Sequence, residues 1–188
     1  MNDLFISYAH IDDLPISEDQ KGWISEFHRV LQNRLAQLMG EKPKIWRDQK
    51  LSGSDIFDNE IVDQFKNTKL MVSVLSPRYI KSEWCNKEIK EFYRNAELSS
   101  GVALAGKSRV LKVVKTPYDP QDVHPELKQV FGSVLGFNFY DFDNDSGKVV
   151  EYNEAFGKEA RQNYFTRIYD LAYEICEILK KSDGKRSG

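Results

Sequence analysis

The stretch KLMVSVLS, residues 69–76, is apolar at nearly every position. Side chains of a strand point alternately to its two faces, so such a run is typical of a strand buried on both faces, as in a parallel sheet between two layers of helices. Four more short apolar runs fit the same sheet. They are DLFISY (3–8), PKIWRD (43–48), SRVLKVVK (108–115) and SVLGFNFYDF (133–142). The sequence therefore predicts a mostly parallel sheet of five strands.

Helical patterns separate these strands. Apolar residues recur at helical spacing over residues 23–38, 56–65, 84–96 and 160–181, and a short helix is expected within 119–131. This alternation of strands and helices predicts an α/β fold with helices on both faces of the sheet. The polar, glycine-bearing segment 143–159 is expected to be an exposed excursion.

The composition fits one domain of an ordinary globular protein. The 188 residues are 40% hydrophobic and 30% charged, with a net charge of -2, which argues against general binding to nucleic acid or to a membrane surface. Two cysteines are too few for a disulfide framework, so the cytoplasm is the expected compartment. We expect a domain over residues 1–181, with 182–188 as a polar tail or linker to a further sensor domain, and neither a secretory signal nor a membrane span.

The stretch SEWCNKEIKEF, residues 82–92, contains a carboxylate on the apolar side of its helix. At about 100° per residue, Glu88 falls inside an arc of roughly 140° that also contains Trp84, Cys85, Ile89 and Phe92. A buried carboxylate costs several kcal/mol unless it is paired or lies in a polar opening. Glu88 therefore predicts either a structural ion pair, with Arg47 or Lys50, or a catalytic group.

The sequence supports other chemistries less well. Loops after the first three strands, residues 8–13, 48–55 and 76–85, should meet at the carboxyl edge of the sheet, where ligands bind in such folds. These loops match neither a dinucleotide fingerprint nor a phosphate-binding loop. Cys85 is expected to be a core residue rather than a nucleophile. The acidic pair Asp12 and Asp13 is interpreted as solvated loop acids, and no metal site is predicted.

Three blocks together resemble the characteristic motifs of a TIR (Toll/interleukin-1 receptor) domain, particularly of the bacterial type. They are DLFISYAH (3–10), IWRDQKLSGSDIFDNEI (45–61) and LSPRYIKSEWCNKEI (75–89), and they appear in the order of that family. The resemblance covers about residues 1–180 and implies a flavodoxin-like five-stranded parallel sheet. It also implies a self-association loop that contacts other TIR domains, made by Gln49, Lys50, Leu51, Ser52, Gly53 and Ser54.

Many members of this family cleave NAD+ to nicotinamide and ADP-ribose or a cyclic variant. The resemblance implies Glu88 as the catalytic residue, four positions after Trp84, with NAD+ as a substrate and no further cofactor. The implied substrate-binding residues are Trp84, Asp48, Tyr8, Ala9, His10 and Tyr118. The chain departs from the family at Ala9, where some active members have arginine, and at Ile56, where an aromatic residue is common.

Structural interpretations stay open at three of these positions. Trp84 could pack in the core, a role that is compatible with a pocket wall. Asp48 could instead cap the turn that follows its strand, and Tyr118 could be an exposed aromatic of a turn between Pro117 and Pro120. Two functions also stay open. The resemblance implies an NAD+ glycohydrolase that self-association activates, in bacterial antiphage defence, and the alternative is a non-catalytic adaptor that only recruits other TIR domains.

Overall fold

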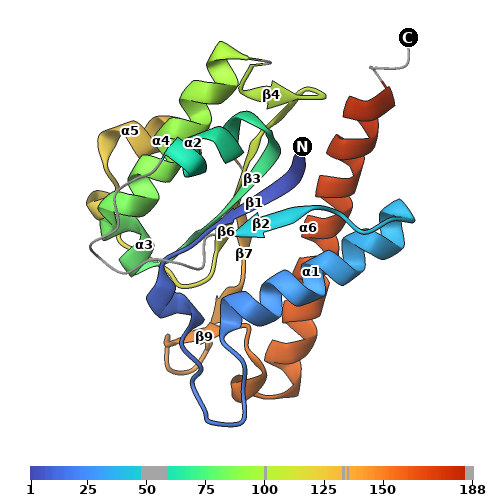
Figure 1. Ribbon diagram of the computed structural model, residues 1–188. Helices are drawn as coiled ribbons and strands as arrows, with labels where there is room; N and C mark the ends of the chain where they lie inside the picture. Colours follow the sequence, from blue (N-terminus) through green and yellow to red (C-terminus); the bar gives the residue numbers. More distant parts are fainter. Residues whose placement is uncertain (48–58, 100, 133, 135, 185–188) are drawn as a thin grey trace.

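The computed structural model describes residues 1–47, 59–99, 101–132, 134 and 136–184 (Figure 1). Five parallel strands form the central sheet in the order β2-β1-β3-β6-β7. They are β1 (Asn2–Ser7), β2 (Ile45–Arg47), β3 (Thr68–Leu75), β6 (Val110–Val114) and β7 (Gly136–Asn138). The predicted five-stranded parallel sheet is confirmed.

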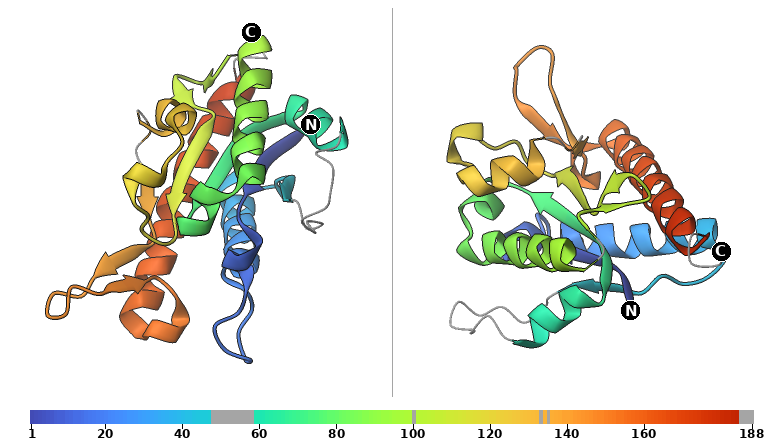
Figure 2. Two further views of the ribbon diagram at one scale, coloured as in Figure 1. Left: turned by 90° about the vertical axis from the view of Figure 1, so that its left-hand side faces the viewer. Right: turned by 90° about the horizontal axis from the view of Figure 1, so that it is seen from above.

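Helices cover both faces of this sheet (Figures 1 and 2). On one face, α1 (Trp23–Met39) and α6 (Lys158–Gly184) pack on side chains such as Leu4 and Ile6. On the other lie α2 (Asn59–Lys66), α3 (Pro77–Lys81), α4 (Glu83–Leu98) and α5 (Pro125–Phe131). Along β1, Phe5 points to this second face, so by strand alternation Ser7 points there too.

The start of α4 follows directly from its sequence. The hydroxyl of Ser82, the N-cap residue, accepts a hydrogen bond from the Cys85 backbone N–H at 3.3 Å, and Glu83 places negative charge in the first turn. The helix therefore begins where its cap predicts. Its buried stripe contains the predicted Cys85, Glu88 and Phe92, whereas Trp84, which was predicted on the same arc, is only half-buried.

The prediction of a single strand over residues 133–142 is wrong. After β7 the chain leaves the sheet, and β8 (Tyr140–Phe142) pairs instead with β9 (Val149–Glu151) in an antiparallel hairpin. The chain changes direction at Phe139, whose ring is fully buried. Its backbone N–H donates to the carbonyl of Val114 in β6, and its carbonyl accepts from the Tyr152 backbone N–H. The segment 143–159 is thus only partly an exposed excursion, since Tyr152 belongs to the core.

Shorter elements complete the fold. The hairpin of β4 (Ala103–Leu104) and β5 (Lys107–Ser108) was not predicted, and its turn places Ala105 at a φ of 53°. Single 3-10 turns are η1 (His10–Asp13), η2 (Pro120–Asp122) and η3 (Glu154–Phe156). The predicted start of the second helix at residue 56 lies outside the described residues. Among the described residues, no helix is both long enough and apolar enough to span a bilayer.

Candidate functional site

Helix α4 carries Glu88 to the carboxyl edge of the sheet. The side chain is 2% exposed, as the apolar arc in the sequence predicts. Ser7, the last residue of β1, meets it there, because β1 ends under the second turn of α4. The site therefore joins the first strand to the helix that follows the third.

Among the described residues, Ser7 and Trp84 donate hydrogen bonds to the Glu88 carboxylate, each to a different oxygen. The Ser7 hydroxyl donates to Oε2 at 2.5 Å, and the Trp84 indole N–H donates to Oε1 at 3.2 Å. The Ser7 oxygen also shares a hydrogen bond of 2.9 Å with the Tyr79 hydroxyl of α3. The hydrogen bonds from Ser7 and Trp84 fix the orientation of the carboxylate. The group is thereby held as an oriented acceptor beneath the edge of the sheet.

The alternative of an ion pair between Glu88 and Arg47 is wrong. The Arg47 guanidinium lies 3.4 Å from Asp13 Oδ2 and donates to the Ser25 hydroxyl at 3.1 Å. Asp13 in turn accepts from the Ser25 backbone N–H at 2.7 Å, near the start of α1. These contacts hold the Arg47 side chain on the α1 side of the sheet edge. The other named partner, Lys50, lies outside the described residues.

The residues after β1 divide between the two faces. Ala9 packs on the α4 side, and the Tyr8 carbonyl accepts a hydrogen bond from Cys85 Sγ at 3.6 Å, so the backbone here contacts α4. The Tyr8 ring points the other way and stacks on His10, with centroids 5.3 Å apart. Arg47 lies over the same ring at 5.8 Å. His10 Nε2 and Arg47 Nε are buried, and neither atom has a hydrogen-bond partner among the described residues.

Of the predicted site residues, the structure joins Glu88 directly to Trp84. Tyr118 packs against the core on the α3 and α5 side, and burial together with the nearby Tyr140 raises its pKa. No hydrogen bond links Tyr118 to Glu88 in the described part of the chain. Asp48 and the self-association loop Gln49–Ser54 lie outside the described residues.

Cys85 has the environment of a core residue, as predicted. Its side chain is 2% exposed, and burial, together with the negative charge of Glu88, raises the pKa of the thiol well above its ordinary value. A nucleophilic cysteine needs the opposite shift, because the thiolate is the reactive form. The structure gives Cys85 a packing role beside Glu88.

Two interactions at this edge were missed in the sequence. Ser7 carried a signal, since it is a hydroxyl within the otherwise apolar end of DLFISY. The interpretation of Asp12 and Asp13 as solvated acids is wrong: Asp12 accepts from the Ser76 hydroxyl at 2.6 Å, and burial raises its pKa. Both acids bond partners far along the chain, which local patterns do not reveal.

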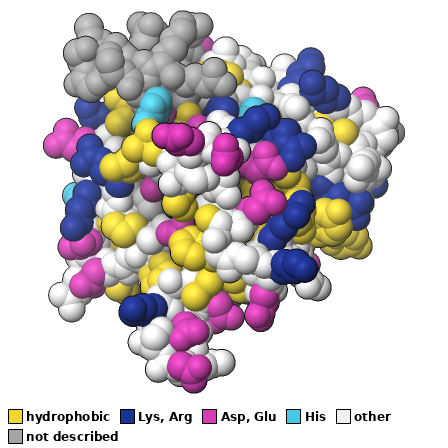
Figure 3. Space-filling model, turned by 90° about the horizontal axis from the view of Figure 1, so that it is seen from below, with side chains coloured by type: hydrophobic (Ala, Val, Ile, Leu, Met, Phe, Trp, Pro, Cys, Tyr) yellow, Lys and Arg dark blue, Asp and Glu magenta, His cyan; other side chains and the backbone are white. Residues whose placement is uncertain are grey.

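Several charged side chains elsewhere in the described chain form ion pairs. Lys81 lies 3.0 Å from Asp122, whereas Lys69 lies 3.2 Å from Asp3 at the opposite end of β3. Lys115, after β6, lies 3.0 Å from Glu151. Figure 3 shows basic and acidic side chains interspersed over the face seen from below. Within the described ranges, no group of three or more acidic, histidine or cysteine side chains is placed to hold a metal ion.

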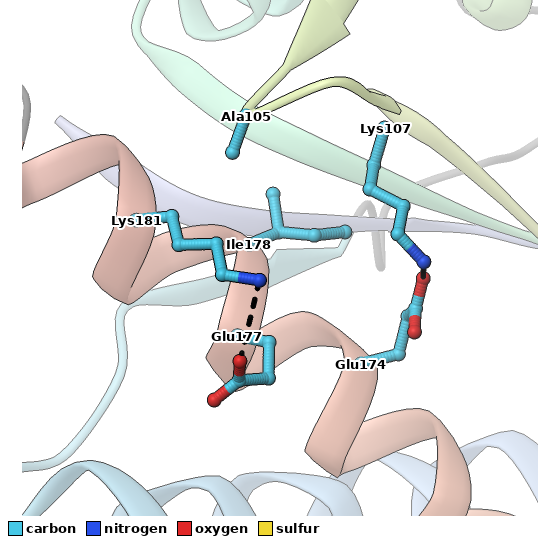
Figure 4. Close-up of a pocket in the computed structure, with 6 residues that line it drawn as sticks. All are labelled: Ala105, Lys107, Glu174, Glu177, Ile178 and Lys181. Atoms are coloured by element: carbon cyan, nitrogen blue, oxygen red, sulfur yellow. Dashed lines mark hydrogen bonds and ion pairs between the residues drawn. The ribbon is translucent and has the colours of Figure 1, made fainter.

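Two cavities lie away from Glu88. One, of about 220 Å³, opens between the β4–β5 hairpin and the end of α6 (Figure 4). Its charges satisfy one another, since Lys107 lies 2.6 Å from Glu174 and Lys181 lies 3.5 Å from Glu177. The other, of about 280 Å³, lies between the starts of α1 and α6.

A family model matches most of this chain. The family model of the TIR domain matches residues 4–149. No curated protein matches the chain. A similar solved structure is that of the activated Roq1 resistosome directly recognizing the pathogen effector XopQ (TIR domains), at 15% identity and a TM-score of 0.42, over 92% of this chain and 84% of that chain. Because the family model spans more than half of the sequence, the chain belongs to the TIR domain family.

Proposed function

We propose that this TIR domain is an NAD+ glycohydrolase with Glu88 as its catalytic residue. The observation that carries the proposal is the buried carboxylate at the carboxyl edge of the sheet, oriented by Ser7 and Trp84. Such edges are where ligands bind in open α/β sheets. The TIR family includes both NAD+-cleaving and signalling members, so the assignment depends on this one side chain.

The chemistry of NAD+ cleavage needs a single carboxylate. The bond between the ribose C1′ and the nicotinamide nitrogen breaks, and its electron pair leaves with a ring that becomes neutral. No acid has to protonate this leaving group, unlike the two-carboxyl arrangement of ordinary glycoside hydrolysis. Glu88 stabilises the positive charge that develops on the sugar, and water then adds to C1′ and loses a proton.

The resting geometry implies a movement before turnover. Glu88 is only 2% exposed, so binding of NAD+ has to uncover its carboxylate. The partly exposed Trp84 indole, which is bonded to Oε1, is the side chain that we expect to move. We assign His10 a substrate contact. Its Nε2 is buried without a hydrogen-bond partner among the described residues, so the same movement has to uncover it. We also assign substrate contacts to Asp48, Tyr8, Ala9 and Tyr118, as the resemblance implies.

Self-association is the proposed trigger. We propose that the loop Gln49–Ser54 of one copy docks on another and that assembly favours the uncovered state of Glu88. NAD+ depletion by such assemblies in the cytoplasm would serve bacterial antiphage defence. Nicotinamide release per molecule should then rise with protein concentration, and a rate per molecule that stays constant across the range in which oligomers form would contradict the assembly step.

The second candidate is an adaptor that recruits other TIR domains without catalysis. Incubation of the purified domain with NAD+, with nicotinamide followed by chromatography, separates the two functions. The glycohydrolase releases nicotinamide in concentrated samples. Absence of release from samples shown by light scattering to be assembled would leave the adaptor function.

A further inference from the structure

A cavity of about 280 Å³ lies on the face of the sheet opposite Glu88. The segment before α1, the first turns of α1 and the start of α6 enclose it. Trp23 and Tyr164, which line it, belong to the core on the α1 and α6 side, whereas Glu88 belongs to α4 on the other side. The cavity is therefore separate from the proposed catalytic site.

Aromatic rings form the inner wall of this cavity. Tyr164 packs edge-on against Trp23, with centroids 5.7 Å apart, and against Phe165, at 5.6 Å. The Trp23 indole N–H donates to the Tyr152 carbonyl at 3.1 Å, which fixes that ring as well. Rings held in this way lose little freedom when a ligand binds, so the wall is preorganised for a flat apolar partner.

The Tyr164 hydroxyl is a polar group without a partner in the described part of the chain. The side chain is 6% exposed, and its hydroxyl is buried without a hydrogen bond to any described residue. Glu26 and Arg29 line the same cavity as Tyr164. Burial raises the pKa of this phenol, which therefore stays neutral and can both donate and accept.

The charges at the mouth balance. Three acidic residues, Asp19, Glu26 and Glu154, face three basic ones, Lys21, Arg29 and Arg161. Arg29 bonds Glu26, and Arg161 lies 3.3 Å from Glu154. A phosphate or another polyanion would have to compete with these carboxylates. The lining favours an uncharged ligand, and the volume lies just below the roughly 300 Å³ at which drug-sized sites begin.

We propose that this cavity binds a small uncharged planar heteroaromatic ring whose polar edge pairs with the Tyr164 hydroxyl. Nucleobases and pyridine carboxamides share this chemistry. The Asn153 side-chain oxygen already accepts from the Ala155 backbone N–H at 3.0 Å, which leaves its NH₂ as a second donor for the ring edge. The ring itself stacks against Phe165.

Calorimetric titration of the whole chain with adenine and with nicotinamide tests the proposal. At least one ring should bind, and the Tyr164→Phe variant should bind it about three- to tenfold more weakly, the loss expected for one neutral hydrogen bond. The matched control is Tyr173→Phe, since Tyr173 lies on the same helix but is 62% exposed. Its affinity should equal that of the wild type. Failure of both rings to bind, or unchanged affinity of Tyr164→Phe, would overturn the proposal.

Three further measurements separate this site from other possibilities. Titration of the Glu88→Gln variant should give unchanged affinity, because Glu88 lies on the other face, and a loss there would place the ring at the catalytic site instead. AMP should bind no more tightly than adenine, and tighter binding of AMP would contradict the charge argument. The empty Tyr164→Phe protein should melt at a higher temperature than the wild type, since it no longer buries an unpaired hydroxyl, and a lower melting temperature would show that the hydroxyl has an internal partner.

Discussion

Ser7 and Glu88 are 81 residues apart in the sequence, and the hydroxyl of one donates to the carboxylate of the other at 2.5 Å. Both side chains are buried, with exposures of 1% and 2%. The contact joins the end of β1 to the second turn of α4. It gives the first strand a direct influence on the orientation of the proposed catalytic group.

Substitution Ser7→Ala should lower the kcat of NAD+ cleavage about ten- to a hundredfold, because a carboxylate that loses its orienting donor is misplaced in the transition state. The KM should change less, since Ser7 is too buried to contact the substrate. The matched control is Ser73→Ala, a buried serine beside Ser7 in the β1–β3 register that makes no hydrogen bond to Glu88. Equal kcat in the two variants, measured as nicotinamide release, would contradict the orienting role.

Cys85 should resist thiol reagents while the protein is folded. Both cysteines are buried, and burial with the adjacent Glu88 raises the pKa of the Cys85 thiol. Labelling with a chromogenic disulfide reagent should therefore be slow under native conditions and reach two thiols only after denaturation. Rapid native labelling of Cys85, identified by peptide mass, would show that the site opens far more often than the buried geometry implies.

Asp12→Asn should stabilise the protein at neutral pH. Burial is the main cause that raises the pKa of Asp12, while the Ser76 hydrogen bond opposes it. A raised folded-state pKa means that the folded protein holds this proton more tightly than the unfolded chain does. The charged form therefore costs stability above the folded-state pKa, and the cost fades as the pH falls through it. The advantage of the Asp12→Asn variant over wild type in the free energy of unfolding should shrink on acidification, and a growing advantage would reverse the assigned sign.

Lys115→Met should destabilise the fold by about 3 kcal/mol, the cost of leaving one member of a largely buried pair uncompensated. Glu151 also accepts from the Thr116 hydroxyl, so the pair ties the end of β6 to the β8–β9 hairpin. Urea unfolding measures the change. Lys107→Met, which breaks an exposed pair with Glu174, should cost less than about 1 kcal/mol. Recovery of stability in the double variant Lys115→Met/Glu151→Gln is expected, and equal costs for the two single variants would contradict the difference in burial.

Periodicity was sufficient to predict the sheet and the face that each long helix buries. Glu88 could be assigned to the buried side of α4 because one helix fixes the angles of its own residues. The sequence could not reveal that β7 and β8 are separate strands, because Phe139 redirects the chain through backbone bonds to distant residues.

Contacts between distant segments set the limit at the site as well. Asp12 accepts a hydrogen bond from Ser76, which is 64 residues away in the sequence, and Arg47 pairs with Asp13 rather than with Glu88. These residue types are common on protein surfaces, so the sequence alone does not indicate which of them pair. Which side chains pair depends on which loops meet at the edge of the sheet. The family resemblance identified Glu88 and Trp84, and only the structure added Ser7 and Tyr79 behind them.

The most direct test of the catalytic assignment compares Glu88→Gln with Glu83→Gln in nicotinamide release from NAD+. Both changes remove one carboxylate from α4, but Glu83 is exposed in its first turn. Glu88→Gln should fold and lose at least about a hundredfold in kcat, the usual effect of removing an electrostatic stabiliser of a transition state, while Glu83→Gln keeps wild-type turnover. Wild-type turnover in folded Glu88→Gln would contradict the account.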